Sequence, residues 1–334
     1  MSSFEVIPGK VVKEILDTSR AQVVGIVEDT YLRHDAGQTV NPDSYFLRFP
    51  DKPDSRIIAL PAAIELAGAR LAGIKWVSSF PANVANGLPR ASAVLVLNDY
   101  DTGYPIALLE AASISAARTA ASAAAVARVI ARAVPGDGRV GVIGAGIIAR
   151  SILSYLAATS YHVGDAVIYD LDGSSAASLS RFVVDELGIP ARVASTVDEA
   201  LAPATVITAT TALRPHIATP MRPGQVALHI SLRDFEPAVI SAAENYVDDV
   251  EHCLKANTST HLAEQATGGR DFVNGTVADL LTGRRRPSGA RGVIFSPFGL
   301  GVLDLAVGHF VLSAARQRGL GLPIAEFFGE TRRW

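Results

Sequence analysis

The residues with the clearest chemical potential form a glycine-rich turn. Gly144, Ala145, Gly146 and Ile147 follow a short apolar run and precede a helical pattern, and Ala149 completes the motif G-x-G-x-x-G/A. Between a strand and a helix this motif is typical of dinucleotide binding. The first glycine permits a tight turn, the second lets the backbone approach a pyrophosphate, and the start of the helix offers free N–H groups to the anion. The alternative is a strand–helix turn that binds nothing.

An acidic residue at the end of the next strand pattern indicates which dinucleotide. Asp170 closes the run Ala-Val-Ile-Tyr-Asp and follows Gly144 at close to the expected spacing of about 20 residues. A carboxylate there accepts hydrogen bonds from a ribose 2′-OH but repels a 2′-phosphate. Residues 171–175 contain no Arg or Lys to neutralise that phosphate, so NAD is predicted over NADP. A helix N-cap is the alternative role, and it suits Asp172 better than Asp170.

Polar residues also follow the later strand patterns, where ligands bind in open α/β sheets. We predict cofactor contacts for Thr208, Thr210 and Ser231, although threonine is also a common strand residue. Asp234 precedes Glu236-Pro237, which is a helix start. It is therefore either a helix N-cap or a catalytic carboxylate, and the residues alone leave both open.

Three basic residues interrupt apolar segments in the first part of the chain. Lys75 lies in Leu-Ala-Gly-Ile-Lys-Trp-Val, Arg118 lies in Ser-Ala-Ala-Arg-Thr-Ala-Ala, and Arg48 lies in Tyr-Phe-Leu-Arg-Phe-Pro. Burying such a cation is costly unless it meets an anion, and a guanidinium can bind a carboxylate through two parallel hydrogen bonds. The cations predict a carboxylate ligand or, equally on spacing alone, a surface charge or an internal salt bridge.

Composition limits the class of protein. The 334 residues predict two domains, and a charged fraction of 19% suits an ordinary soluble enzyme. The net charge of −3 gives no indication of nucleic-acid or membrane partners. With one cysteine, Cys253, and no metal-ligand spacing of histidines, we predict neither a disulfide nor a metal site. The N-terminus lacks a signal-peptide pattern, so a cytoplasmic protein is expected.

The first part of the chain predicts a sheet framed by helices. A helix is predicted over 11–32 and an Ala-rich, packed helix over 111–133, which is interrupted by arginines and so is not a membrane span. Between them, short apolar runs separated by Gly, Pro and Asp predict a mostly antiparallel sheet. These runs are 57–60, 71–77, 93–98 and 106–109.

From residue 139 strand and helix patterns alternate. The predicted strands cover 139–144, 166–170, 205–209, 226–230 and 292–295, and the predicted helices cover 146–158, 174–187, 235–243 and 276–282. This alternation predicts a Rossmann-type, doubly wound parallel α/β sheet, assigned to an NAD-binding domain over 119–304. The last apolar helix, 302–315, can return to the first region. We therefore expect a discontinuous α+β domain over 1–118 plus 305–334.

Four blocks, in this order along nearly the whole chain, resemble the ornithine cyclodeaminase/mu-crystallin family: Gly73–Trp76, Asp99–Pro105, Ser115–Ala121 and Gly144–Gly146. The resemblance implies a homodimer whose first domain binds a small amino acid and forms the subunit interface. By the family pattern Lys75 and Arg118 hold the substrate carboxylate at the catalytic centre and Arg48 assists. The catalytic aspartate of the family falls on Asp234, which favours the second of its two roles.

Segments 75–81, 89–93 and 231–234 resemble one branch of the family, which supplies 2,3-diaminopropionate for siderophores and peptide antibiotics. That branch oxidises and hydrolyses a secondary amine that joins glutamate to diaminopropionate, releasing 2-oxoglutarate and NADH. Cyclodeaminases of the family carry a Gly-Asp-Cys-Pro-Gly-Lys-like segment where this chain has Arg-Asp-Phe-Glu-Pro-Ala, which argues against a cyclodeaminase. The mu-crystallin-like NADP binders carry basic or neutral residues at the position of Asp170, which again favours NAD. The alternatives are a cyclodeaminase, another imine-forming dehydrogenase or ketimine reductase, and a non-catalytic nucleotide-binding protein of the crystallin type.

Overall fold

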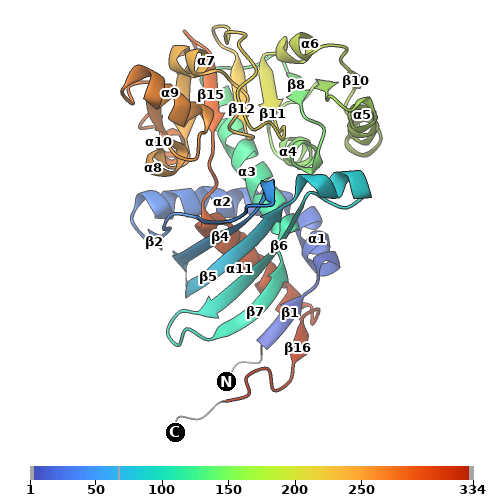
Figure 1. Cartoon of the computed structure of the whole chain (residues 1–334), viewed down its shortest axis with the longest axis vertical. Helices are drawn as coiled ribbons and strands as arrows, with labels where there is room; N and C mark the ends of the chain where they lie inside the picture. Colours follow the sequence, from blue (N-terminus) through green and yellow to red (C-terminus); the bar gives the residue numbers. More distant parts are fainter. Residues whose placement is uncertain (1–3, 67, 331–334) are drawn as a thin grey trace. The chain divides into compact units, whose positions relative to one another are not determined.

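The computed structural model describes residues 4–66 and 68–330, which fall into two compact units (Figure 1). Unit 1 consists of Met1–Arg118 and Leu300–Trp334, and unit 2 consists of Thr119–Gly299. We predicted the second boundary between residues 304 and 305. It lies earlier because the whole of α11 (Gly301–Gln317) packs on the sheet of unit 1. The roles assigned to the two domains remain predictions.

Unit 1 is built on an eight-stranded sheet with the strand order β16-β1-β7-β6-β5-β4-β2, in which β3 also pairs with β4. Every pairing is antiparallel except that of β1 with β7, so the predicted, mostly antiparallel sheet is confirmed. The strands are β1 (Phe4–Ile7), β2 (Thr39–Val40), β3 (Tyr45–Phe49), β4 (Lys52–Leu66), β5 (Ala69–Ser79), β6 (Ala91–Asp99), β7 (Pro105–Glu110) and β16 (Leu322–Ile324). Besides α11, the helices are α1 (Gly9–Thr18), α2 (Arg20–Asp35) and the 3-10 helix η1 (Pro81–Asn86).

Helices cover one face of this sheet. Helix α11 packs on β4, β5 and β6 and against α2, and Figure 1 shows it behind these strands. Leu95 and Leu109 on the covered face are 0% exposed. On the opposite face Trp76 and Val94 lie directly across from one another and stay 41% and 38% exposed. The sheet therefore has one buried face and one open apolar face.

The single helix predicted over 11–32 is in fact two helices, α1 and α2. They separate at Ser19, where φ is −129° and ψ is 23°. The Thr18 hydroxyl donates to the carbonyl oxygens of Glu14 and Ile15, which a continuing helix would use for backbone bonds. The spacing of apolar residues does not predict such side-chain hydrogen bonds to the backbone, so it did not predict the break at Ser19.

Unit 2 is a parallel sheet with the order β10-β9-β8-β11-β12-β15-β13-β14. This confirms the predicted Rossmann-type, doubly wound architecture. The strands are β8 (Arg139–Ile143), β9 (Asp165–Tyr169), β10 (Ala191–Val193), β11 (Thr205–Thr208), β12 (Val226–His229), β13 (Glu244–Val247), β14 (Val273–Thr276) and β15 (Val293–Ser296). The helices are α4 (Ile147–Ala157), α5 (Gly173–Leu187), α6 (Val197–Leu201), α7 (Pro237–Ala242), α8 (Val250–Cys253), α9 (Ser259–Thr267) and α10 (Val277–Thr282).

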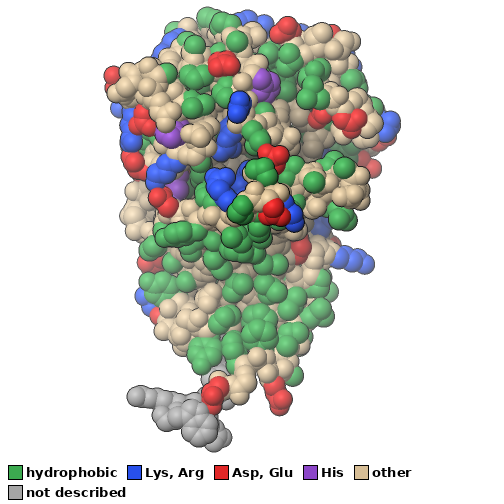
Figure 2. All heavy atoms as spheres, in the orientation of Figure 1, with side chains coloured by type: hydrophobic (Ala, Val, Ile, Leu, Met, Phe, Trp, Pro, Cys, Tyr) green, Lys and Arg blue, Asp and Glu red, His purple; other side chains and the backbone are tan. Residues whose placement is uncertain are grey.

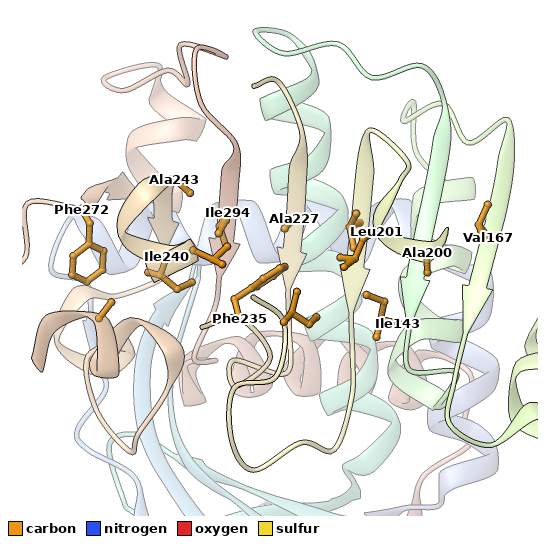
Figure 3. Close-up of a cluster of buried hydrophobic side chains, with 14 of the residues drawn as sticks. Ile143, Val167, Ala200, Leu201, Ala227, Phe235, Ile240, Ala243, Phe272 and Ile294 are labelled. Atoms are coloured by element: carbon orange, nitrogen blue, oxygen red, sulfur yellow. The ribbon is translucent and has the colours of Figure 1, made fainter. Parts of the chain in front are cut away.

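The centre of the unit 2 sheet is buried on both faces, as expected for parallel strands. All residues of β11, β12, β13 and β15 are buried. On one face Phe235 and Ile240 belong to the same apolar cluster as Ala227 and Ile294 (Figure 3). We did not predict three strands, β10, β13 and β14. β10 and β14 lie at the two edges and β13 lies between β15 and β14, and Asn and Gly in β14 give it low β-propensity.

Helix α3 (Ala112–Ala131) begins in unit 1 and continues into unit 2. Among the described residues it is the one helix whose length and apolar composition would let it cross a membrane. In the protein, however, 72% of its most apolar window is buried. It has the burial of a packed core helix, as predicted.

Candidate functional site

The glycine turn after β8 has the backbone that the motif requires. Gly144 has a φ of 91°, and a Cβ there would lie 2.6 Å from the carbonyl oxygen of Ala209. Ala149 is 0% exposed, so α4 packs closely on the sheet. Gly146 is the N-cap of α4, and a Cβ on it would meet no atom within 4 Å. The turn therefore leaves room before the α4 N-terminus, where an anion can bind backbone N–H groups.

Asp170, just after β9, contacts the same turn. One carboxylate oxygen accepts a hydrogen bond from the Ala145 N–H at 2.6 Å, and the other accepts one from the Asp172 N–H at 2.9 Å. Asp172 caps α5 by accepting from the N–H groups of Ser174 and Ser175. The capping role therefore belongs to Asp172, and Asp170 stands where the motif places its ribose-binding acid.

Asp234 is fully buried after the end of β12. Its Oδ1 accepts a hydrogen bond from the Thr210 hydroxyl and its Oδ2 accepts one from the Ser231 hydroxyl. Both hydroxyl-bearing residues are partly exposed, whereas Thr208, at 3.4 Å from the Ser231 hydroxyl, is buried. The N-cap of α7 is Glu236, so the N-cap alternative for Asp234 is wrong. Asp234 instead forms the buried end of a hydroxyl network that reaches the surface.

The imidazole of His229 supports the backbone of Asp234. Its Nε2 accepts a hydrogen bond from the Asp234 N–H at 3.2 Å, and its Nδ1 lies 3.0 Å from the Ser296 hydroxyl. A nitrogen that accepts carries no proton, so the hydrogen sits on Nδ1 and is donated to Ser296. Burial lowers the pKa of His229 to about 4 against the opposing attraction of the Asp234 carboxylate. At pH 7 the ring is neutral and holds Asp234 without giving it a counter-charge.

The backbone between Ser231 and Asp234 takes an uncommon conformation. Leu232 has a φ of 66°, a left-handed geometry that costs a non-glycine residue about 1–2 kcal/mol. Its carbonyl oxygen accepts a hydrogen bond from the Ser259 N–H at 2.7 Å, and its side chain is buried. Strain of this kind clusters at functional sites. Here it accompanies the turn that brings the Ser231 hydroxyl onto the Asp234 carboxylate.

In unit 1 two of the predicted cations meet on one buried carboxylate. Lys75 Nζ lies 2.7 Å from Asp304 Oδ2, and Arg118 Nε lies 3.4 Å from Asp304 Oδ1. The internal salt bridge that we weighed is therefore present for both cations. The cluster sets two positive charges against one negative charge. The two terminal nitrogens of Arg118 bond to none of the described residues, so its fork can still bind an anion.

Lys75 is almost completely buried. Its side chain is 2% exposed, and its ammonium also donates to the Ser115 hydroxyl at 3.1 Å. Burial lowers the pKa of Lys75 to about 8, with Asp304 opposing the shift and Arg118 adding to it. An ammonium has three N–H groups, and Asp304 and Ser115 use two of them. The third can donate to a ligand carboxylate.

Arg48 does not join this cluster. It is exposed on β3 directly opposite Arg56 of β4, whereas Lys75 lies opposite Leu60, four positions further along β4. Its guanidinium carbon lies 5.3 Å from the centre of the Phe46 ring. The structure thus brings Lys75 and Arg118 together and places Arg48 beside a different arginine.

Sequence reasoning missed Asp304 and His229. Asp304 is a lone charge in the apolar helix 302–315, which is the same signal as Lys75 in its apolar strand: a charge that is costly to bury without a partner. For His229 the sequence shows only that a histidine ends a strand. Nothing in one sequence indicates which backbone group its ring accepts from.

The chain resembles several known proteins over nearly its full length. The profile of the ornithine cyclodeaminase/mu-crystallin family matches residues 10–319. Nodulation efficiency protein NfeD of Rhizobium meliloti is 30% identical over 91% of this chain and 93% of its own length. N-((2S)-2-amino-2-carboxyethyl)-L-glutamate dehydrogenase of Staphylococcus aureus is 29% identical over 80% of this chain and 82% of its own length. An archaeal alanine dehydrogenase, solved as a dimer with bound NAD, matches with a TM-score of 0.84 and 25% identity, covering 98% of this chain and 100% of its own.

Proposed function

The chain belongs to the ornithine cyclodeaminase/mu-crystallin family, and we propose that it is an NAD-dependent oxidoreductase acting on the CH–NH bond of an amino acid. The specific reaction is oxidation and hydrolysis of N-((2S)-2-amino-2-carboxyethyl)-L-glutamate to L-2,3-diaminopropionate, 2-oxoglutarate and NADH. The observation that carries the proposal is the presence in unit 2 of both an open glycine turn and a buried carboxylate held by hydroxyls. The name of the Staphylococcus aureus relative supports the finer assignment.

The residues of unit 2 fit NAD. A Cβ on Gly146, the N-cap of α4, would meet no protein atom within 4 Å, so the backbone is open to a ligand there and the N–H groups at the start of α4 can bind the pyrophosphate. Asp170 lies at hydrogen-bonding distance from the same turn and would repel a 2′-phosphate. Thr210 and Ser231 offer partly exposed hydroxyls to the nicotinamide ribose. When bound, NAD accepts the hydride from the carbon that carries the amine.

Lys75 and Arg118 hold the substrate carboxylate in this proposal. Their cluster with Asp304 keeps a net positive charge, and each still has N–H groups to donate. Charge-assisted hydrogen bonds of this kind fix the orientation of a carboxylate. Holding the carboxylate fixes the neighbouring carbon, whose hydride must face the nicotinamide, and such positioning lowers the barrier by several kcal/mol.

Asp234 exchanges protons with the substrate through its hydroxyl partners. A Ser231 or Thr210 hydroxyl accepts the proton of the substrate ammonium and passes its own to the carboxylate. After this proton has left to solvent, the same route takes a proton from the water that attacks the C=N carbon. The proton taken from the water is passed to the nitrogen, the C–N bond breaks, and the hydroxyl formed from the water loses its proton, which leaves the amine of 2,3-diaminopropionate and the ketone of 2-oxoglutarate.

We also propose that the protein is a cytoplasmic homodimer. The uncovered face of the unit 1 sheet is apolar, and Figure 2 shows hydrophobic side chains gathered over unit 1. Ile74 lies opposite Val96 and Trp76 opposite Val94 on this face. A continuous apolar face of this kind is usually covered, and a second copy of the same sheet would be complementary to it. The alanine dehydrogenase that matches in fold is a dimer.

One assay tests the reaction. Purified protein with NAD is offered the glutamate conjugate, L-ornithine or L-alanine in separate reactions, and NADH absorbance is followed together with 2-oxoglutarate. We expect NADH and 2-oxoglutarate in equal amounts from the conjugate alone. Conversion of ornithine to proline without net NADH would instead identify a cyclodeaminase. NAD binding without turnover of any of the three would support a crystallin-type binding protein.

A further inference from the structure

Three arginines lie together at one end of the unit 1 sheet. Arg48 of β3 is directly opposite Arg56 of β4, and Arg56 is directly opposite Ser79 of β5. Residues directly opposite in antiparallel strands point to the same face, with their Cβ atoms about 5 Å apart. Arg90, the residue before β6, donates from Nη1 to the Ser79 hydroxyl at 2.7 Å. The three guanidinium groups therefore follow one another across four strands.

These arginines lack a counter-charge. Among the residues that the structure describes, no carboxylate forms an ion pair with any of the three. Asp54, two residues before Arg56 on β4, is exposed and forms no ion pair with it. Burial and the charge of Arg48 lower the pKa of Arg56, and burial and the charge of Arg56 lower the pKa of Arg90. Arg56 and Arg90 are partly buried with no acid paired to them among the described residues, so their charges are held at a cost that a bound anion would relieve.

The arginines share a sheet face with the Lys75 cluster. Ser79 and Lys75 are four residues apart on β5, so their side chains point to the same face. Four steps along a strand separate the two rows of Cα atoms by about 13 Å. Lysine and arginine side chains are long, so the charged groups of the two clusters can lie closer together than their Cα atoms. One extended ligand can therefore place one carboxylate at Lys75 and Arg118 and another near Arg56.

We propose that Arg56 and Arg90, with Arg48 beside them, form a second anion subsite that binds a carboxylate remote from the one held by Lys75 and Arg118. The proposal rests on the proposed function and assigns recognition of a second carboxylate of its substrate to these arginines. The second positive charge of ornithine would be repelled there, and alanine would leave the subsite empty. The subsite thus selects the substrate by charge at a distance from the reacting carbon.

The test compares three substrates on three variants. The substrates are the glutamate conjugate, the conjugate of glutamine, which lacks the γ-carboxylate, and N-(2-aminoethyl)-L-glutamate, which lacks the carboxylate of the diaminopropionate half. The variants are Arg56→Gln, Arg90→Gln and, as a control, Arg20→Gln, which removes a cation of α2 that pairs with Asp17 of α1. We expect the wild-type protein to turn over one analogue roughly 10- to 100-fold less well than the conjugate, in kcat/KM.

Arg56→Gln and Arg90→Gln should lower kcat/KM for the conjugate by a similar factor and leave the disfavoured analogue unchanged, so that discrimination disappears. Arg20→Gln should keep the wild-type discrimination between the conjugate and the disfavoured analogue, and Arg56→Lys should keep part of this discrimination. Equal losses on all three substrates, or no loss on any, would overturn the proposal.

A binding measurement separates this proposal from the proposed function. If the wild-type protein turns over none of the substrates, the proposed function has failed, and calorimetric titration with glutarate still tests the subsite. We expect glutarate to bind at least about tenfold more weakly to Arg56→Gln than to the wild type and to Arg20→Gln. Equal binding to all three, or no binding to the wild type, would show that the arginines do not form an anion subsite.

Discussion

Among the described residues each unit has one carboxylate that is 0% exposed, and the two are stabilised in different ways. In unit 1 Asp304 is neutralised by Lys75 and Arg118. In unit 2 Asp234 is held by two hydroxyls and by a neutral imidazole at its backbone, and it forms no ion pair with a Lys or Arg among the described residues. A paired carboxylate is fixed in its charged state. A carboxylate held by hydroxyls keeps a route for protons, and this contrast agrees with the anion-binding role proposed for the unit 1 cluster and the proton-transfer role proposed for Asp234.

Removing the charge in unit 1 should have the largest effect on folding. Asp304→Asn leaves two buried cations without an acid, and breaking a buried pair in this way costs about 3–5 kcal/mol. Urea unfolding followed by circular dichroism measures the loss. The double variant Asp304→Asn with Lys75→Met removes both charges and should recover much of it. If Asp304→Asn alone is as stable as the wild type, the ion pairs of Asp304 do not stabilise unit 1.

Replacing the buried aspartate of unit 2 by asparagine should affect turnover more than folding. Asp234→Asn can still accept one hydroxyl hydrogen bond, so we expect a loss of stability of about 1 kcal/mol. Without a carboxylate to take the proton, kcat should fall by at least about 100-fold. Asp172→Asn is the matched control, because it changes an acid of the same unit that only caps α5. Unchanged turnover in Asp234→Asn would exclude the catalytic role.

The Lys75 ammonium should give the unit 1 site a pH limit. Its pKa in the folded protein is about 8, so it loses its charge as the pH rises through 8, and carboxylate affinity should fall by up to about tenfold per pH unit above that. The inhibition constant of 2-oxoglutarate, which has no amine to titrate, measures this directly. Stability responds with the opposite sign. The unfolded chain binds the proton more tightly, so this group favours folding increasingly from pH 8 to about 10.5. A constant affinity from pH 7 to 9.5 would contradict the assignment.

The imidazole in unit 2 should affect stability at acid pH. The pKa of His229 is lowered to about 4, so the unfolded chain binds the proton more tightly. Its contribution to stability is therefore complete above about pH 6.5 and is lost as the pH falls toward 4. His229→Gln can still accept from the Asp234 N–H but does not titrate. Its midpoint in urea should change less over this range than that of the wild type.

The sequence was most informative where a feature is local. The predicted strands β8, β9, β11, β12 and β15 follow from the alternation of apolar runs, and the turn at Gly144 follows from a positive φ that only glycine adopts easily. The packed helix 111–133 and the return of helix 302–315 could also be read from patterns of apolar residues.

Contacts between distant segments could not be read in the same way. The bond from Lys75 to Asp304 joins residues far apart in the chain, and the pairing of Arg48 with Arg56 depends on the register of one hairpin. The two roles left open for Asp234 were separated by geometry, because the helix after it begins two residues later than a cap at Asp234 would require. Periodicity gives the face on which a side chain lies, but it does not give the partner that the face meets.

The position of Asp304 on α11 has a consequence for how the polypeptide matures as it leaves the ribosome. The acid that neutralises Lys75 emerges only after the whole of Thr119–Gly299 has been translated. Unit 2 is continuous in sequence and can fold first, as early-emerging domains do. The sheet of unit 1 lacks the acid that pairs with Lys75 until α11 has been synthesised and packs on it. A nascent chain arrested before Leu300 should therefore resist protease over residues 119–299 and remain sensitive over residues 1–118.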